Sequence, residues 1–116
     1  MKNAFEVSFA KNEYNQRQLR RMLDNLSYYS KGKIHLKRLI SQLEGLLGSI
    51  QQVDKSWREE FVKHWGTLEE IYSICLTDGG EGLKAEDKQD IQRAAKALEN
   101  LVLPLIFKDG SSAVQS

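Results

Sequence analysis

The stretch that decides the fold is Asp54–Gly80, DKSWREEFVKHWGTLEEIYSICLTDGG. Its large aromatic residues, Trp57, Phe61 and Trp65, recur every four residues, so an α-helix places them along one side. Five further residues continue this apolar stripe: Leu68, Ile71, Tyr72, Cys75 and Leu76. A stripe of this length and bulk has to be covered by other helices.

Three more helices are predicted around this one. Together the four segments span residues 12–28, 34–51, 56–78 and 85–103. In the second segment Leu36, Ile40, Leu43, Leu47 and Ile50 follow a spacing of four and three, which is typical of a bundle. We therefore predict an all-α, antiparallel bundle of four main helices that forms a single domain over residues 1–116.

Local signals set the expected ends of these helices. Gly32 is suited to the left-handed turn after the first helix, and either Asp54 or a Ser56–Glu59 capping box starts the third. We interpret Gly66 as room for a neighbouring side chain. Residues 1–11 are expected to form an extended arm, Pro104 to be followed by a short final turn, and residues 109–116 to be a frayed tail.

Composition excludes several classes of protein. Apolar residues make up 41% and charged residues 28% of the 116, which is close to ordinary globular values. The single cysteine, Cys75, cannot form an internal disulfide, and we expect a buried, inert thiol. No apolar run approaches the roughly 18–20 residues of a membrane span, and no signal peptide is recognisable, so the cytoplasm is expected.

Charge is distributed unevenly along the chain. Residues 1–53 contain nine Lys/Arg and four Asp/Glu, whereas residues 54–116 contain eight and twelve. The acidic half offers a surface that can steer and hold a basic protein. Its candidate partner-binding residues are Glu59, Glu60, Glu69, Glu70, Asp78, Glu81 and Asp87. A solvated helix face with local pairs such as Glu59–Lys63 is the alternative.

The sequence also allows two functions other than binding a basic protein. The basic half suggests nucleic-acid binding, with Tyr28 and Tyr29 available for stacking on bases, although the pI of about 7.8 is low for such a domain. Its basic residues are Arg17, Arg20, Arg21, Lys31, Lys33, Lys37 and Arg38. Arg58 and His64 also resemble the signature of HEPN-type helical ribonucleases, but positions six apart lie roughly 120° apart around a helix.

No cofactor or metal site is predicted. One cysteine and two histidines, His35 and His64, are too few for a zinc site, and no pair of Glu-x-x-His motifs is present for a di-iron bundle.

A family resemblance sharpens the expected function. The runs Tyr29-x-x-Gly32-x-Ile34-x-Leu36-x-x-Leu39-Ile40-x-x-Leu43-Glu44 and Trp57-x-x-x-Phe61-x-x-x-Trp65-x-x-Leu68-Glu69 carry it. Over about residues 29–80 they resemble small all-helical bacterial immunity proteins of polymorphic toxin and contact-dependent growth inhibition systems. The resemblance implies a non-enzymatic inhibitor that binds a cognate toxin domain, often a nuclease such as an EndoU-type RNase, and occludes its active site.

Overall fold

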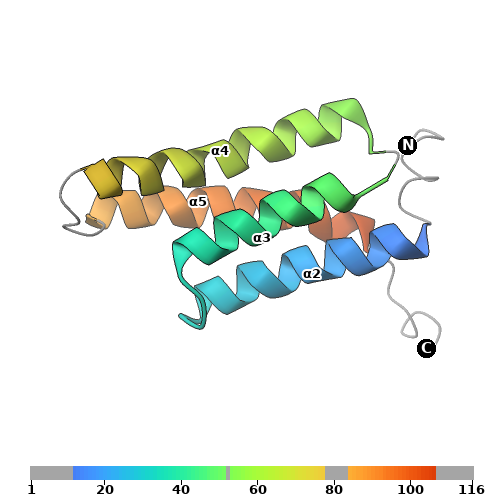
Figure 1. Cartoon of the computed structure of the whole chain (residues 1–116), viewed down its shortest axis with the longest axis horizontal. Helices are drawn as coiled ribbons and strands as arrows, with labels where there is room; N and C mark the ends of the chain where they lie inside the picture. The colour runs from blue at the N-terminus through green and yellow to red at the C-terminus, as the bar shows by residue number, and fades with distance from the viewer. Residues whose placement is uncertain (1–11, 52, 78–83, 107–116) are drawn as a thin grey trace.

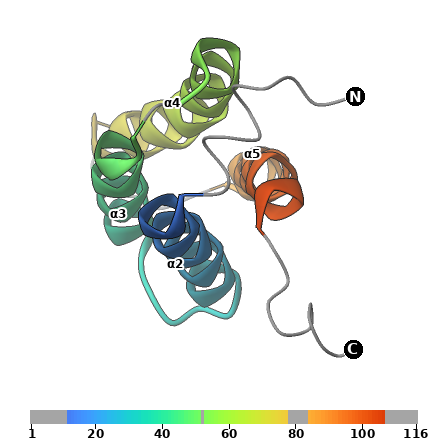
Figure 2. The ribbon, with the colours of Figure 1, turned by 90° about the vertical axis from the view of Figure 1, so that its right-hand side faces the viewer.

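The computed structural model describes residues 12–51, 53–77 and 84–106, with the side chains of residues 76 and 77 left out. These residues form four α-helices: α2 (Glu13–Ser30), α3 (Leu36–Ser49), α4 (Lys55–Thr77) and α5 (Ala85–Val102). A short 3-10 turn, η1 (Leu103–Leu105), follows. Successive helices run in opposite directions (Figure 1), and the end-on view in Figure 2 shows all four around one interior. The all-α antiparallel bundle is therefore confirmed.

The core is built from the apolar stripes that the helical periodicity predicts. Its buried apolar side chains are Leu19, Met22, Leu26, Leu36, Leu39, Ile40, Leu43, Leu46, Leu47, Ile50, Trp57, Phe61, Leu68, Ile91, Ala94, Leu98, Val102 and Leu105. Every helix contributes to this one cluster. Burial of apolar surface at about 25 cal/mol per Å² is the main stabilising term for such a bundle.

The two tryptophans of α4 fasten that helix to different neighbours. The Trp57 Nε1 donates to the Leu101 carbonyl oxygen on α5 at 3.0 Å. The Trp65 Nε1 donates to the Ile40 carbonyl oxygen on α3, also at 3.0 Å. Phe61 is fully buried between these two positions, and its ring centroid lies 5.3 Å from that of Trp57. The aromatic stripe thus holds α4 between α3 and α5.

Coverage of the stripe is less complete than predicted. Trp57, Phe61 and Leu68 are buried, but Trp65, Ile71, Tyr72 and Cys75 are only half-buried. The side chain of Leu76 lies outside the described residues. For Ile71, Tyr72 and Cys75 the cause is the length of the neighbours, because α4 has 23 residues and α3 only 14. Trp65 lies beside α3, where its indole bonds to Ile40.

Helix ends agree with the predicted ones within two residues. Asn12 caps α2, its Oδ1 accepting from the backbone N of Tyr14 at 2.8 Å and of Asn15 at 3.2 Å. Gly32 adopts the expected positive φ of 75°. The α3 helix starts later than predicted, at Leu36, because His35 is still extended.

Asp54, and not a Ser56–Glu59 capping box, starts α4. The Asp54 Oδ2 accepts from the Trp57 backbone N at 3.3 Å and from the Ser56 hydroxyl at 2.9 Å. The Glu59 carboxylate pairs instead with Lys55, one turn back. The hydroxyl of Ser56 is therefore occupied as a donor and does not cap the helix.

Two predicted local features are wrong. A Cβ built at Gly66 meets no atom within 4 Å, so this glycine makes no room for a neighbour. Pro104 lies inside the final turn, in the first positions of η1, instead of preceding it. The first turn of a helix tolerates proline because its backbone N needs no intrahelical partner. The predicted arm over residues 1–11 and the tail over 109–116 lie outside the described residues.

Candidate protein-binding surface

Glu59 and Glu60, the first two predicted partner-binding residues, lie among basic side chains. The Glu60 Oε2 lies 3.7 Å from Lys63 Nζ and 3.2 Å from His64 Nε2, and Glu59 lies 4.0 Å from Lys55 Nζ. These pairs span one helical turn and are largely exposed, so each stabilises the helix by only a few tenths of a kcal/mol. The predicted Glu59–Lys63 pair is replaced by Glu59–Lys55.

A shallow hollow on the same part of α4 confirms its mixed charge. It is lined by Lys55, Arg58, Glu59, Val62 and Lys63, three bases and one acid. The N-terminal half of α4 is therefore not the acidic face that the sequence suggested.

Glu69 and Glu70 have a different environment. Both are exposed, and within the described chain neither has an ion pair or a side-chain hydrogen bond. No lysine or arginine occurs between Lys63 and Lys84. At about 100° per residue, Glu70 lies on the same side of α4 as Glu59, whereas Glu69 lies toward one flank. The strongest acidic character of α4 is thus in its C-terminal half.

Of the remaining predicted acids, Asp87 has a structural role. The Asp87 Oδ2 accepts from the backbone N of Lys84 at 3.2 Å, so this carboxylate caps α5. Asp78 and Glu81 lie outside the described residues. Glu86 and Asp90 are exposed on the first turns of α5, and Asp90 pairs with Arg93 at 3.1 Å.

The C-terminal end of α4 extends past the α2–α3 pair. With 23 residues against 14, α4 exceeds α3 by about 13 Å at a rise of 1.5 Å per residue. The two helices are joined at the opposite end, so the extra length lies beyond the start of α3, as Figure 1 shows. We call residues 69–75 the α4 extension.

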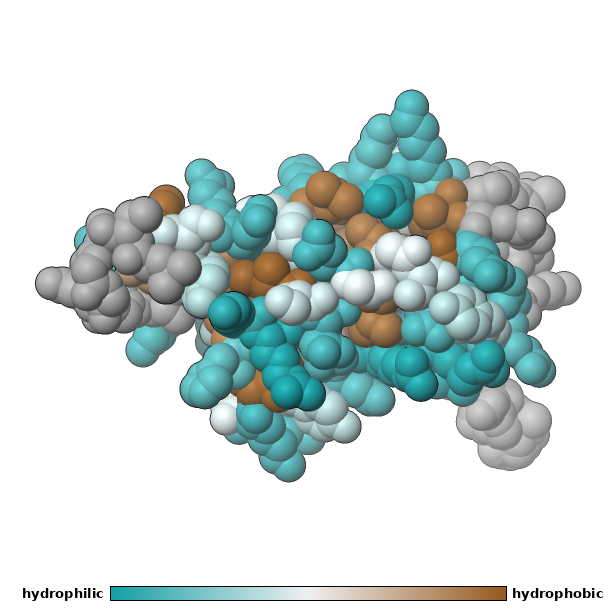
Figure 3. Space-filling model, viewed as in Figure 1, coloured by the Kyte–Doolittle hydropathy of each residue, from teal (hydrophilic) through white to brown (hydrophobic). Residues whose placement is uncertain are grey.

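Apolar side chains reach the surface on the α4 extension. Ile74 is 52% exposed, and Ile71, Tyr72 and Cys75 are half-buried. Figure 3 shows a mostly hydrophilic face with separate apolar spots over α4 and α3. The α4 extension therefore combines unpaired carboxylates with accessible apolar atoms, a mixture that protein interfaces share.

The basic residues of the first half lie on the surface of α2, of the α2–α3 turn and of the first turn of α3. All seven named in the sequence analysis are exposed. The Arg17 guanidinium lies 5.8 Å from the centroid of the Tyr14 ring. Tyr28 is 45% exposed, whereas burial raises the pKa of the half-buried Tyr29 phenol above its ordinary value. Of the two tyrosines predicted to stack on bases, Tyr28 has the more accessible ring.

Arg58 and His64 do not form a joint site. His64 interacts with Glu60 on its own helix, and Arg58 is exposed. Within the part of the chain that the structure describes, no interaction joins the two side chains. In the same part, no three His, Cys, Asp or Glu side chains are grouped as metal ligands would be. No described helix is long and apolar enough to cross a membrane.

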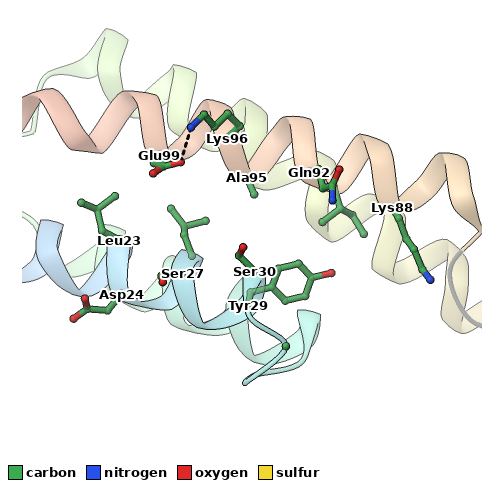
Figure 4. A pocket seen from close by; sticks show the side chains of 13 residues that line it. Leu23, Asp24, Ser27, Tyr29, Ser30, Lys88, Gln92, Ala95, Lys96 and Glu99 are labelled. Carbon is green, nitrogen blue, oxygen red and sulfur yellow. Dashed lines mark hydrogen bonds and ion pairs between the residues drawn. The ribbon is translucent and has the colours of Figure 1, made fainter.

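A groove between α2 and α5 was missed by the sequence interpretation. Its volume is about 700 Å³, and its walls come from the C-terminal half of α2 and the N-terminal two thirds of α5 (Figure 4). Small side chains line both walls: Ser27 and Ser30 on α2 and Ala95 on α5. The sequence did contain a signal for this groove. Small residues on the facing sides of two helices fill little of the space between the helices, so a groove can form there.

Comparison with protein-family models, with curated proteins and with solved structures gave no match to this chain.

Proposed function

We propose that this chain is a helical immunity protein, which binds and neutralises a basic toxin domain through the α4 extension. The observation that carries the proposal is the pair of exposed carboxylates of Glu69 and Glu70, which have no ion pair with any described residue, beside half-buried Ile71 and Tyr72. The class of partner, a toxin domain, comes from the resemblance of residues 29–80 to immunity proteins.

The chemistry of this surface suits binding more than a reaction. Carboxylates on a regular helix are held in fixed positions, and their field raises the rate at which a basic partner arrives. Apolar atoms beside them lose water on contact and hold the partner once it has arrived. Nuclease toxins bind phosphates through basic surfaces, so an acidic helix can occupy the same place as the substrate.

The proposal is tested with the product of the gene adjacent to this one, which we expect to contain the toxin domain. In the double variant Glu69→Lys/Glu70→Lys, we expect the dissociation constant to rise about 10- to 100-fold, because two attractive contacts become repulsive. Wild-type affinity should also fall as ionic strength rises from about 0.01 to 0.1 M, where the Debye length shrinks from about 30 to 10 Å.

The matched control is Glu13→Lys/Glu44→Lys, which changes net charge equally at exposed positions on α2 and α3. Equal losses in both double variants would mean that overall charge, and not the α4 extension, governs binding. An adjacent gene product that is not toxic, or cells that remain sensitive when this chain is expressed, would reject the immunity function.

A further inference from the structure

Basic side chains gather on one side of α2. Figure 4 shows the Asp24 carboxylate on the side of this helix that is turned away from α5. At about 100° per residue, positions three, four and seven residues from Asp24 lie within about 60° of it around the helix. Such positions are occupied by four bases and one aromatic residue: Arg17, Arg20, Arg21, Tyr28 and Lys31. All five are exposed, so this face of α2 carries them over about 21 Å.

The turn after α2 adds a base at the end of this face. Gly32 has a positive φ, and the backbone N of Lys33 donates to the Tyr28 carbonyl oxygen at 2.8 Å. This hydrogen bond holds the backbone of Lys33 against the last turn of α2. The exposed bases of the face and of the turn, together with Tyr28, are called the basic surface: Arg17, Arg20, Arg21, Tyr28, Lys31 and Lys33.

The basic surface lies in a part of the chain with a high positive charge, although the whole chain is nearly neutral. Residues 17–38 contain seven Lys or Arg and a single acid, Asp24. Every ion pair between two described residues lies on α4 or α5, so none of them involves Arg17, Arg21 or Lys31. The positive field of this surface is therefore available to attract a polyanion.

The class of polyanion follows from the exposed ring. Tyr28 lies between Arg21 and Lys31 along α2, and 45% of it is exposed. Basic side chains that follow a backbone, with an aromatic ring on which a base stacks, are the elements of a single-strand binding surface. A helix that lies in a membrane needs an apolar face instead. The exposed large apolar residues of the described chain are Tyr28, Val62, Ile74 and Leu103, and only the first lies on the basic surface.

We propose that the basic surface binds single-stranded nucleic acid. Phosphates of a strand that lies along α2 accept hydrogen bonds from Arg17 and Arg21 on one side of Tyr28 and from Lys31 on the other. One base between these phosphates stacks on the Tyr28 ring. Nothing in these contacts reads a base edge, so binding is independent of sequence. The proposal concerns α2 and not the α4 extension, and its test needs no toxin.

The probes are fluorescein-labelled oligouridylate and oligothymidylate of about twelve nucleotides and a duplex of the same length. By fluorescence anisotropy at about 0.05 M salt, we expect a dissociation constant of about 10–100 μM for both single strands. With about four phosphate contacts, the logarithm of the binding constant should fall with the logarithm of the salt concentration with a slope of about −3.

A double variant tests the phosphate contacts. Arg17→Gln/Lys31→Gln removes the bases at the two ends of α2's basic face. The salt dependence should become shallower by about 1 to 1.5, and the dissociation constant should rise about tenfold or more. The matched control is Arg58→Gln/Lys88→Gln, which removes one arginine and one lysine at exposed positions on α4 and α5. Its dissociation constant should change less than about twofold, because salt screens charges that do not touch the strand.

Tyr28 variants separate stacking from charge. Tyr28→Ala should weaken the binding of both single strands about 5- to 50-fold, because it removes the ring on which a base stacks. Tyr28→Phe keeps a ring and should retain the affinity. Duplex binding should be the same for all three proteins, since paired bases are not free to stack on the ring.

The acids on this side of α2 predict a gain of affinity. Asp24 lies among the bases, and Glu13 lies on the same side at the start of the helix. Asp24→Asn removes a charge that repels phosphate and should strengthen binding about two- to fivefold. Glu44→Gln, at an exposed position on α3, is the matched control and should leave the affinity unchanged.

Four outcomes would overturn the inference. The first is no rise in anisotropy up to about 1 mM protein, at least tenfold above the expected dissociation constant. The second is an equal loss of affinity in Arg17→Gln/Lys31→Gln and in its control. The third is wild-type affinity of Tyr28→Ala for single strands. The fourth is displacement of the oligonucleotide by polyglutamate of equal charge or by phosphatidylserine vesicles at lower charge concentration than by unlabelled oligonucleotide, which would assign the surface to an acidic protein or a membrane. Circular dichroism of each variant establishes that its fold is retained.

Discussion

Buried amide side chains join the start of α2 to two distant parts of the chain. Asn15 is fully buried, and its side chain pairs with the backbone of Gln51 in both directions: its Nδ2 donates to the carbonyl oxygen at 2.8 Å, and its Oδ1 accepts from the backbone N at 2.9 Å. This pairing satisfies backbone groups that have just left α3. The neighbouring Gln16 reaches η1 in a similar way.

Replacing Asn15 should therefore be costly. Asn15→Ala leaves a partly buried backbone donor and acceptor of Gln51 without these partners and opens a space in the interior, and we expect a loss of about 2 kcal/mol in the free energy of unfolding, measured by urea denaturation. Asn25→Ala is the matched control, because the Asn25 side chain bonds only within its own helix, to the Arg21 carbonyl oxygen. A loss of less than about 0.5 kcal/mol for Asn15→Ala would contradict its structural role.

Tyr29 should make stability sensitive to alkaline pH. Its pKa is raised in the fold by burial, so the phenolate is disfavoured there, while the unfolded chain ionises near pH 10. Stability is therefore unaffected well below pH 10 and falls as pH rises through and above that value. In thermal unfolding measurements, the stability of Tyr29→Phe should therefore decline less than that of the wild type as pH rises above about 10. Tyr28→Phe, at an exposed ring, should follow the wild-type curve; identical curves for all three proteins would contradict the assignment.

At the scale of a helix, two glycines have opposite consequences. Gly66 lies in the interior of α4 with open space where a Cβ would be, so Gly66→Ala should raise stability by about 0.5–1 kcal/mol. Gly32 has a φ of 75°, so Gly32→Ala should lower it by about 1–2 kcal/mol. Thermal unfolding of both variants checks the pair, and a shift in the same direction for both would contradict the helix geometry described above.

Most of each helix could be predicted from the sequence, because the spacing of apolar residues shows which side is buried. Leu36, Leu43 and Leu47 are buried as that spacing predicts. Burial of Asn15 could not be predicted in this way. An amide is stable inside only where a distant backbone supplies partners, and the spacing of residues within α2 carries no information about Gln51.

The candidate surface was predicted only in part for a related reason. Periodicity places acids around α4, but ion pairs depend on which bases lie one turn away, as with Lys55 beside Glu59. The role of Asp87 as a cap depends on where α5 begins. Glu69 and Glu70 are exposed and have no ion pair within the described chain, because no lysine or arginine is near them along the sequence.

At the scale of the molecule, the bundle consists of two helical hairpins of unequal length. The α2–α3 pair is shorter than the α4–α5 pair, which extends past it at the end where α4 ends and α5 begins (Figure 1). Several apolar residues of α4 are consequently buried where α3 accompanies them, whereas those beyond its start are half-buried or exposed. Phe61 and Leu68 belong to the first group, Tyr72 and Cys75 to the second. The surface proposed to bind a partner is thus the part of the helix with the least support.

This inequality predicts a gradient of hydrogen exchange along α4. Backbone amides at residues 60–68 should exchange only on global unfolding, because their turns lie against both α3 and α5. Amides at residues 70–75 should exchange at least about tenfold faster through local opening, since fewer buried side chains hold those turns. Native-state exchange measured by NMR separates the two groups, and α3, which is accompanied along its whole length, provides the reference.

If the α4 extension binds its partner, the slow regime should spread to residues 70–75 in the complex. Equal protection along α4 in the free protein would instead mean that the extension is covered by other parts of the chain, and the proposed binding surface would then have to be sought elsewhere.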